Sequence, residues 1–223
     1  MASRTRLAIL ALLLLTPAVV LAAGEKAKRT TGIPLGPEWK VLSIFSGTDS
    51  YYTIVEENGE KLIRARYKPP QKTVILYRQL DAPPGYSTMS WKWRVHKPPF
   101  KEGLKPGRIE LDNPAAVYVY FQDGLRKYVI KYVVSVQNPP GANFLSNDST
   151  LLQKLHFVVL RGLPLKIGEW VKEEVNITAD FRKYFLDGKP DGEVPPVTGI
   201  GILSDGDDTG SVVEADYAGF ELR

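Results

Sequence analysis

The sequence predicts an all-β protein, a single antiparallel β-sandwich of the jelly-roll kind with one short helix. Short strand-like runs recur from Trp39 onward, turn residues separate them, and only one segment has a convincing helical pattern. About eleven strands without an internal repeat fit a jelly roll. An immunoglobulin-like sandwich fits less well, because that fold uses fewer strands in about a hundred residues.

Several runs alternate apolar and polar residues, which is typical of strands with one buried and one solvated face. Leu62–Tyr67 and Trp91–Val95 are the clearest examples. Between two of the runs, the stretch Glu57-Asn58-Gly59-Glu60 predicts a tight hairpin turn. In chain order, the strands expected before the C-terminal region are Lys40–Ile44, Tyr52–Glu56, Lys61–Tyr67, Thr73–Leu80, Thr88–Val95, Ala116–Phe121, Lys127–Val136, Leu155–Leu160 and Trp170–Val175.

The expected helix is Thr178–Phe185. Phe181, Tyr184 and Phe185 have the i, i+3, i+4 spacing of a helix face that packs on a core. Thr178 is the expected N-cap, because its hydroxyl can accept a hydrogen bond from a free backbone N–H of the first turn. We expect this helix to close one end of a sheet.

The chain ends on two more apolar runs, Val197–Leu203 and Val212–Leu222, which predict an antiparallel hairpin. The connection between them supplies three carboxylates within four positions, at Asp205, Asp207 and Asp208. Carboxylate oxygens suit a structural calcium ion, and the motifs require no other cofactor. The alternative is a plain turn, because Asp and Gly tolerate left-handed backbone and cap their own turns.

The N-terminus predicts a secretory signal peptide over residues 1–22. Arg4 and Arg6 precede the unbroken apolar run Leu7–Leu15, and the small residue Ala22 follows at a suitable cleavage position. The apolar run is too short to span a bilayer core of roughly 30 Å, although an uncleaved anchor is the alternative. We expect a periplasmic or extracellular protein without a stable membrane anchor, with a flexible leader over residues 23–36 and one sandwich domain over residues 37–223.

The charge balance and the rare reactive residues exclude several function classes. Without Arg4 and Arg6, the 29 basic residues become 27, against 25 acidic ones, so no nucleic-acid partner is expected. The absence of cysteine excludes a disulfide, a thiolate nucleophile and a Cys-based zinc site. The two histidines, His96 and His156, stand near no nucleophile-elbow motif, which disfavours a Ser-His-Asp triad.

A series of short motifs stands in a particular order and spacing: Trp91–Val95, Val117–Phe121, Gly168–Glu174, Asp180-Phe181, Val197–Ile200 and Asp205–Thr209. In this order they resemble the secreted bacterial proteins of domain-of-unknown-function family 3047, from about Trp39 to Leu222. The resemblance implies an exported β-sandwich similar to carbohydrate-binding modules, with no established activity. Asp112, Asp205 and Asp207 match the family pattern, whereas Ala116 and Val134 replace an arginine and a tryptophan that are common in the family.

Trp93, Asp112 and Tyr118 are the candidate ligand-binding residues. Trp93 shares a strand face with Trp91 and precedes a long loop, so its ring could stack on a sugar. The alternative is packing in the core. We favour the core for at least three of the four tryptophans, which are Trp39, Trp91, Trp93 and Trp170.

Glu214 and Asp216 are the candidate catalytic carboxylates. They stand two apart on the last strand, with Cα atoms about 6.5 to 7 Å apart on one face. Glycosidases place two carboxyl groups about 5 to 9 Å apart across a sugar. The favoured alternative is a solvated polar face, with Val213, Ala215 and Tyr217 turned inward.

Export, the sandwich, the aromatic content and the lack of a catalytic constellation favour a non-catalytic binding module for a glycan or a cell-envelope component. One alternative is a carbohydrate-active hydrolase or lyase that uses the strand carboxylates. Another is a structural or assembly partner in the envelope, bound through an exposed sheet edge. The sequence predicts no particular oligomeric state.

Overall fold

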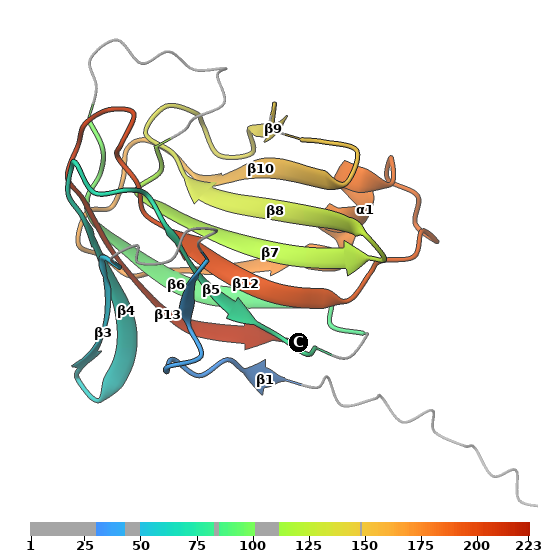
Figure 1. The fold of residues 1–223 in the computed structure, drawn as a ribbon, viewed down its shortest axis with the longest axis horizontal. Coiled ribbons are helices and arrows are strands. Elements are labelled where there is room, and N and C mark those ends of the chain that lie inside the picture. Colours follow the sequence, from blue (N-terminus) through green and yellow to red (C-terminus); the bar gives the residue numbers. More distant parts are fainter. Residues whose placement is uncertain (1–29, 43–49, 83–84, 101–111, 148) are drawn as a thin grey trace, which may run out of the picture.

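Two β-sheets stack face to face in the computed structural model, which describes residues 30–42, 50–82, 85–100, 112–147 and 149–223 (Figure 1). The first sheet contains β1 (Thr31–Gly32), β3 (Tyr52–Glu57), β4 (Glu60–Tyr67), β6 (Thr88–Lys97), β11 (Val171–Asn176) and β13 (Val213–Leu222). Its order is β11-β6-β13-β4-β3, with β1 paired to β13. We call it the six-stranded sheet.

The second sheet has seven strands in the order β2-β5-β12-β7-β8-β10-β9. Their bounds are β2 (Lys40–Leu42), β5 (Ile75–Gln79), β7 (Ala115–Asp123), β8 (Arg126–Val134), β9 (Asn143–Leu145), β10 (Gln153–Arg161) and β12 (Val197–Leu203). The predicted all-β sandwich with one short helix is confirmed. One pair departs from the expected antiparallel pattern, because β8 and β10 are parallel. The chain between them makes a long return, on which β9 forms and pairs with β10 at the sheet edge.

Alternate side chains of the two sheets meet in one core between them, and a second, smaller buried cluster lies on the outer face of the seven-stranded sheet. Trp91 and Trp93 of β6 are 0% and 1% exposed, and the lysine between them points away from the core, as the alternation predicted. Trp39 is also buried, so three of the four tryptophans lie in the core, while Trp170 is half-buried. The largest fully buried side chains are Trp91, Trp93, Tyr67, Tyr132, Tyr217, Phe121, Phe181 and Phe220.

The predicted turn between β3 and β4 is confirmed. Asn58 and Gly59 have φ angles of 52° and 78°, the left-handed backbone that a two-residue hairpin loop requires. The turn joins two strands that extend well beyond the stacked layers (Figure 1).

The expected C-terminal hairpin is wrong. β12 pairs with β5 and β7, whereas β13 pairs with β4 and β6, so the two strands belong to opposite sheets. The connection over residues 204–212 is long enough to cross the roughly 10 Å between stacked sheets. The two strands meet through a side chain, since Tyr217 Oη donates to the carbonyl of Leu203 at 2.7 Å. Apolar runs identify strands, but their partners depend on the whole sheet.

The flexible leader expected over residues 23–36 is too long at its C-terminal end, because residues from Thr31 onward pair with the sandwich. Thr31 and Gly32 pair with β13, and the backbone N–H of Ile33 donates to Phe220 O at 2.8 Å. The side chain of Ile33 is buried, so this segment closes one edge of the core. The predicted signal peptide, residues 1–22, lies outside the described residues. Within the described ranges, no helix has the length and the apolar character to cross a lipid bilayer.

Helix α1 (Ile177–Phe185) covers one end of the sandwich, as expected (Figure 1). Phe181 is buried, and its ring lies 4.9 Å from that of Phe121 in β7. The N-cap, however, is Asn176 rather than Thr178, because Asn176 Oδ1 accepts from Ala179 N at 2.9 Å. The last residue of β11 is extended and leads directly into the helix, which therefore begins one residue earlier than predicted.

The cap assignment predicts an asymmetry between two substitutions. Asn176→Ala should lower the free energy of unfolding by about 1 kcal/mol, because a backbone N–H of the first turn loses its acceptor. Thr178→Ala, the matched control, should cost less, since Thr178 Oγ1 makes only a 3.3 Å bond to Tyr86 O. Urea denaturation of the two variants measures the difference. A larger loss in Thr178→Ala would contradict the assignment.

Candidate functional site

A row of tyrosines lies on the outer face of the seven-stranded sheet. In β7, Val117, Val119 and Phe121 point into the core, so the period of two places Tyr118 and Tyr120 on the opposite face. The rings of Tyr118 and Tyr120 are stacked with centroids 6.0 Å apart. Tyr77 of β5 meets Tyr120 edge to face at 5.2 Å. The row therefore crosses three neighbouring strands, β5, β12 and β7.

Two glycines in β12 make room for these rings. A Cβ atom at Gly199 would overlap the ring of Tyr77, and one at Gly201 would lie 3.3 Å from Tyr120 Cε2. Tyr77 Oη also donates to Thr198 O at 3.1 Å, which ties its ring to the same strand. Glycine inside a strand often marks a close approach of another group. Here the approaching groups are the two half-buried rings.

A groove of about 390 Å³ opens beside the tyrosines, and we call it the tyrosine groove. Its floor is apolar and aromatic, and amide, hydroxyl and ammonium groups stand among the lining side chains. The lining residues are Leu42, Ile75, Tyr77, Tyr118, Tyr120, Phe121, Gln122, Lys127, Val129, Gln153, Leu155 and Thr198. Among the described residues, no carboxylate lines it.

A buried lysine borders the tyrosine row. Lys131 of β8 pairs in register with Tyr118 and is buried, with Nζ 5.3 Å from the Tyr118 ring and 4.8 Å from the Phe157 ring. A buried ammonium needs negative charge or π-electrons nearby. The side chains of Tyr118 and Lys131 both interact electrostatically with the carboxyl group of Asp205.

Asp205 belongs to a group of three carboxylates with Asp112 and Asp207. One ligand atom from each lies within 4.8 Å of the others. Burial raises the pKa of Asp205 to about 7, although the Lys131 charge and the hydrogen bond from Asn113 N act in the opposite direction. The neighbouring charges of Asp112 and Asp207 add to the increase. We call these three residues the acidic cluster.

The acidic cluster differs from the set that the sequence predicted. Asp112 takes the place of Asp208, which is exposed and instead donates its backbone N–H to Asp112 Oδ1 at 3.2 Å. Thr209 N donates to the other oxygen at 2.7 Å, and Asn113 N donates to Asp205 Oδ1 at 2.7 Å. The cluster thus holds the 204–212 connection against the start of β7. Three carboxylates this close offer the oxygen donors that calcium prefers.

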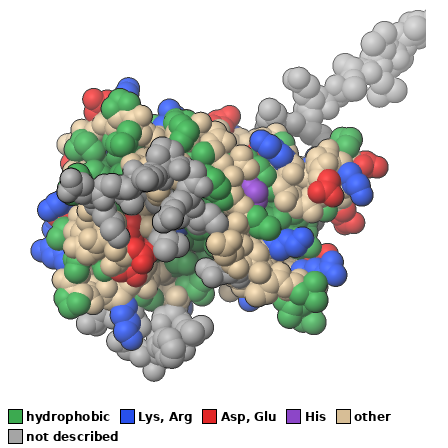
Figure 2. Space-filling model, turned by 90° about the horizontal axis from the view of Figure 1, so that it is seen from above, with side chains coloured by type: hydrophobic (Ala, Val, Ile, Leu, Met, Phe, Trp, Pro, Cys, Tyr) green, Lys and Arg blue, Asp and Glu red, His purple; other side chains and the backbone are tan. Residues whose placement is uncertain are grey.

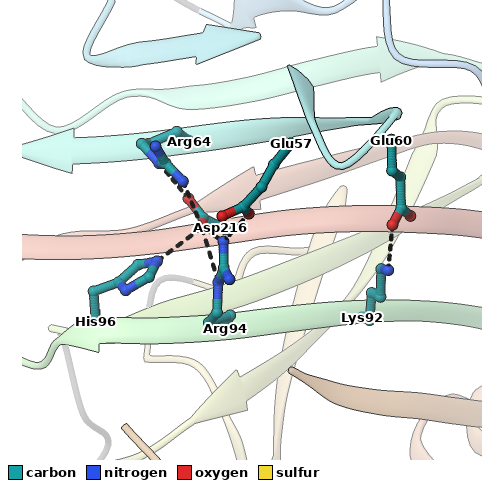
Figure 3. Close-up of polar contacts among 7 residues, drawn as sticks. All are labelled: Glu57, Glu60, Arg64, Lys92, Arg94, His96 and Asp216. Carbon is teal, nitrogen blue, oxygen red and sulfur yellow. Dashed lines mark hydrogen bonds and ion pairs between the residues drawn. The ribbon is translucent and has the colours of Figure 1, made fainter. Parts of the chain in front are cut away.

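A second polar group surrounds Asp216 on the outer face of the six-stranded sheet (Figure 3). Asp216 pairs in register with Arg64 of β4 and Arg94 of β6 and is 0% exposed. Its Oδ1 accepts from Arg64 Nε at 2.8 Å, and its Oδ2 lies 2.6 Å from Arg94 Nη2 and 2.8 Å from His96 Nε2. Arg94 also pairs with Glu57.

The Asp216 network changes the interpretation of the strand carboxylates. Burial by itself would raise the pKa of Asp216, but the hydrogen bonds from Arg64, His96 and Arg94 outweigh burial and hold that pKa below its ordinary value. The prediction that Asp216 lies on a solvated face is therefore wrong, whereas Glu214 is partly exposed. The oxygens of Asp216 are engaged by three cationic or ring-nitrogen groups, which leaves them poorly placed to act on a substrate.

The other sequence candidates lie apart from one another. Trp93 is in the core of the six-stranded sheet, where its Nε1 donates to Glu173 at 3.1 Å, so it offers no stacking surface. Tyr118 lines the tyrosine groove, and Asp112 stands in the acidic cluster. Sequence reasoning missed Tyr77, Tyr120 and Lys131. The spacing of Gly199 and Gly201 within an apolar strand was the pattern that could have pointed to rings lying over β12.

Charge on the surface is mixed. Figure 2 shows basic and acidic side chains interspersed over one face of the molecule, without a continuous basic field. On that face, the distribution lacks the single-sign patch that polyanion binding uses.

The family model described as "Protein of unknown function (DUF3047)" matches residues 37–221. The chain belongs to this family. No curated protein matches the DUF3047 chain in sequence.

Solved structures with similar arrangements have low sequence identity to this DUF3047 protein. The family 11 carbohydrate-binding module from Clostridium thermocellum, in complex with a β-1,3-1,4-mixed-linked tetrasaccharide, is 9% identical, with a TM-score of 0.43 over 86% of this chain and 94% of that one. The catalytic domain of Humicola grisea Cel12A is 10% identical, with a TM-score of 0.43 over 87% and 99%. The family 11 xylanase from Neocallimastix patriciarum is 9% identical, with a TM-score of 0.42 over 89% and 96%.

The Asp216 network predicts a stability change with a defined pH dependence. Asp216→Asn leaves two arginines without their shared counter-charge and should lower the free energy of unfolding at pH 7 by roughly 3–5 kcal/mol. Because the folded-state pKa of Asp216 is lowered, its contribution is present above the unfolded pKa of about 3.9 and is lost as the pH falls through the folded value. The difference between wild type and variant should therefore shrink below about pH 4.

Denaturant titrations between pH 3 and pH 7 measure this difference. Glu60→Gln is the control, since its exposed pair with Lys92 should be worth less than about 1 kcal/mol. A wild-type advantage that stays constant down to pH 3 would show that the Asp216 charge does not carry the effect.

Proposed function

We propose that this protein is a non-catalytic binding module that holds a glycan in the tyrosine groove. The observation that carries the proposal is the pair of half-buried rings, Tyr77 and Tyr120, held edge to face over the glycines of β12. A ligand site of this kind needs rigid apolar surface together with a few polar groups that set orientation. Sugars present the complementary surfaces, since a pyranose ring has apolar C–H faces and a rim of hydroxyl groups.

The groove is preorganised, which lowers the entropy cost of binding. Tyr77 is tied to Thr198 by a hydrogen bond, and Tyr120 is confined between Tyr77 and Tyr118. Rings that are already immobile in the free protein lose little conformational freedom when a ligand stacks on them. Gln122, Gln153 and Lys127 stand among the lining residues and can hydrogen-bond to hydroxyl groups.

The distribution of carboxylates supports binding over hydrolysis. Glycoside hydrolysis requires two carboxyl groups that flank the scissile bond. Among the described residues, none lines the tyrosine groove, and Asp216, one of the two strand carboxylates, lies buried in an ion-pair network on the other sheet. We propose further that binding takes place outside the cytoplasm, on a free glycan or on a glycan-bearing component of the envelope, in agreement with the predicted signal peptide.

The acidic cluster supports a second proposal, a structural calcium ion at Asp112, Asp205 and Asp207. Three carboxylates within 4.8 Å of one another repel unless a cation or a proton intervenes. The cluster joins the start of β7 to the 204–212 connection, so an ion there would strengthen the end of the sandwich that adjoins Tyr118 and Lys131.

The glycan proposal predicts that Tyr120→Ala weakens binding roughly tenfold, because truncation of an aromatic anchor at a binding site costs more than about 1 kcal/mol and about 1.4 kcal/mol is a factor of ten. Isothermal titration against a panel of soluble plant, fungal and bacterial polysaccharides and cell-wall fragments measures the affinity. Tyr120→Phe should bind normally, since the ring is retained. Tyr86→Ala, which removes a half-buried tyrosine that does not line the groove, is the matched control.

Two results would overturn the glycan proposal. One is the absence of binding to every glycan at high micromolar concentration. The other is an unchanged affinity in Tyr120→Ala. Release of reducing ends from a bound polysaccharide would instead favour the hydrolase alternative.

The calcium proposal predicts a higher melting temperature in saturating calcium than in chelator. A ligand at a hundred times its dissociation constant adds about 2.7 kcal/mol to stability, which corresponds to roughly 5–10 °C in a domain of this size. Asp112→Asn should abolish the calcium-induced shift, whereas Asp208→Asn should retain it, because Asp208 lies outside the cluster. Differential scanning calorimetry measures the shift within each variant, and an identical melt with and without calcium would remove the proposal.

A further inference from the structure

Three strongly exposed leucines stand together at one end of the seven-stranded sheet. Leu125 and Leu151 are each 83% exposed, and Leu152 is 54% exposed. Leu125 lies in the turn between β7 and β8, and the other two lie in the turn that enters β10, at the same end of the sheet (Figure 1). We call these three residues the leucine tip.

The register of β8 and β10 brings the two turns side by side. Lys127 pairs with Gln153 in a parallel ladder, and the backbone N–H of Lys127 donates to Leu152 O at 2.8 Å. The three exposed leucines therefore lie on two adjacent turns at one end of the sheet.

Both turns are held by their own hydrogen bonds. Asp123 pairs with Arg126 across a two-residue loop in which Gly124 has a φ of 56°, so the glycine meets the backbone requirement of the turn. In the other turn, Thr150 Oγ1 accepts from Leu152 N at 3.3 Å and from Gln153 N at 3.0 Å. Neither backbone needs leucine at its exposed positions, where polar turn residues are usual.

Basic residues surround the leucine tip. Arg126, Lys127 and Lys154 are exposed, and within the described part of the chain they take part in none of the ion pairs. Among the described residues of the two turns and the first residues of their strands, the only acidic side chain is that of Asp123, and Asp148, on the connection into β10, lies outside the described residues. The tip thus combines exposed apolar side chains with an excess of positive charge.

We infer that the leucine tip is a docking site for an anionic lipid surface. Leucine side chains can enter the boundary between lipid head groups and acyl chains, while flanking lysine and arginine side chains stay at head-group level and attract negative charge. Three leucines on two narrow turns offer too little area for a stable protein interface, which buries about 800 Å² on each partner. Reversible attachment needs only a small apolar insertion combined with a basic rim.

Docking in this orientation has a consequence for the tyrosine groove. Lys127 and Gln153, which neighbour the leucine tip, also line one end of the groove. A docked molecule would hold that end of the groove close to the lipid surface. The lipid-binding site itself does not depend on the proposed glycan site, so each can fail separately.

The absence of cysteine in the chain permits a local test. Leu151→Cys, labelled with an environment-sensitive fluorophore, should show a blue shift on addition of vesicles of phosphatidylglycerol and phosphatidylcholine. Thr53→Cys carries the control label at an exposed position of β3, in the other sheet, and should show no shift. Vesicles of phosphatidylcholine alone should produce little shift at either site, because they lack the anionic charge.

Co-sedimentation of the whole chain with the same vesicles tests the contributing side chains. Leu125→Ser combined with Leu151→Ser should abolish most binding, and removal of all three basic charges by glutamine should weaken it on the order of a hundredfold. Leu163→Ser, which alters a leucine 65% exposed in a different loop, is the matched control. Unchanged binding in the double leucine variant, equal binding to neutral vesicles, or the lack of a shift at residue 151 would each overturn the inference.

Discussion

The burial of alternate side chains between two stacked sheets is the constraint on which the rest of the structure depends. In β7 it directs Val117, Val119 and Phe121 inward and leaves Tyr118 and Tyr120 on the outer face. A register shift of one residue would exchange the two sets, turning Val117, Val119 and Phe121 outward and the tyrosines toward the other sheet. The position of the tyrosine groove is therefore a consequence of core packing, and the site needs no loop to position its rings.

The close approach of rings to β12 links sheet and site. Gly199 and Gly201 weaken the strand locally, because glycine loses more backbone freedom on folding and provides no side chain to pack. Ile200 and Ile202 compensate by lying fully in the core. The strand thus has a core face of large side chains and an outer face of glycine, on which Tyr77 and Tyr120 lie.

Buried charge is accommodated in two different ways on the two sheets. Asp216 is surrounded by Arg64, Arg94 and His96, so its charged form is favoured and the network ties β4, β6 and β13 together. Asp205 has carboxylate neighbours as well as Lys131, so burial dominates and its charged form is disfavoured. The first arrangement satisfies its own charges, whereas the second would gain from a cation. This contrast separates a structural network from a candidate ligand site.

The sequence by itself determined the class of fold, most strand positions, the Asn58-Gly59 turn and the burial of Trp91, because alternation and turn chemistry are local properties. It also identified Asp205 through the carboxylates of the acidic connection, and Asp112 and Tyr118 through the family resemblance. Only the tertiary structure decided that β12 and β13 lie in opposite sheets, that Asp112 replaces Asp208 in the acidic cluster, and that Tyr77 meets Tyr120. Those contacts join residues far apart in the chain, and strand pairing between distant segments depends on how the whole core is filled rather than on any local pattern.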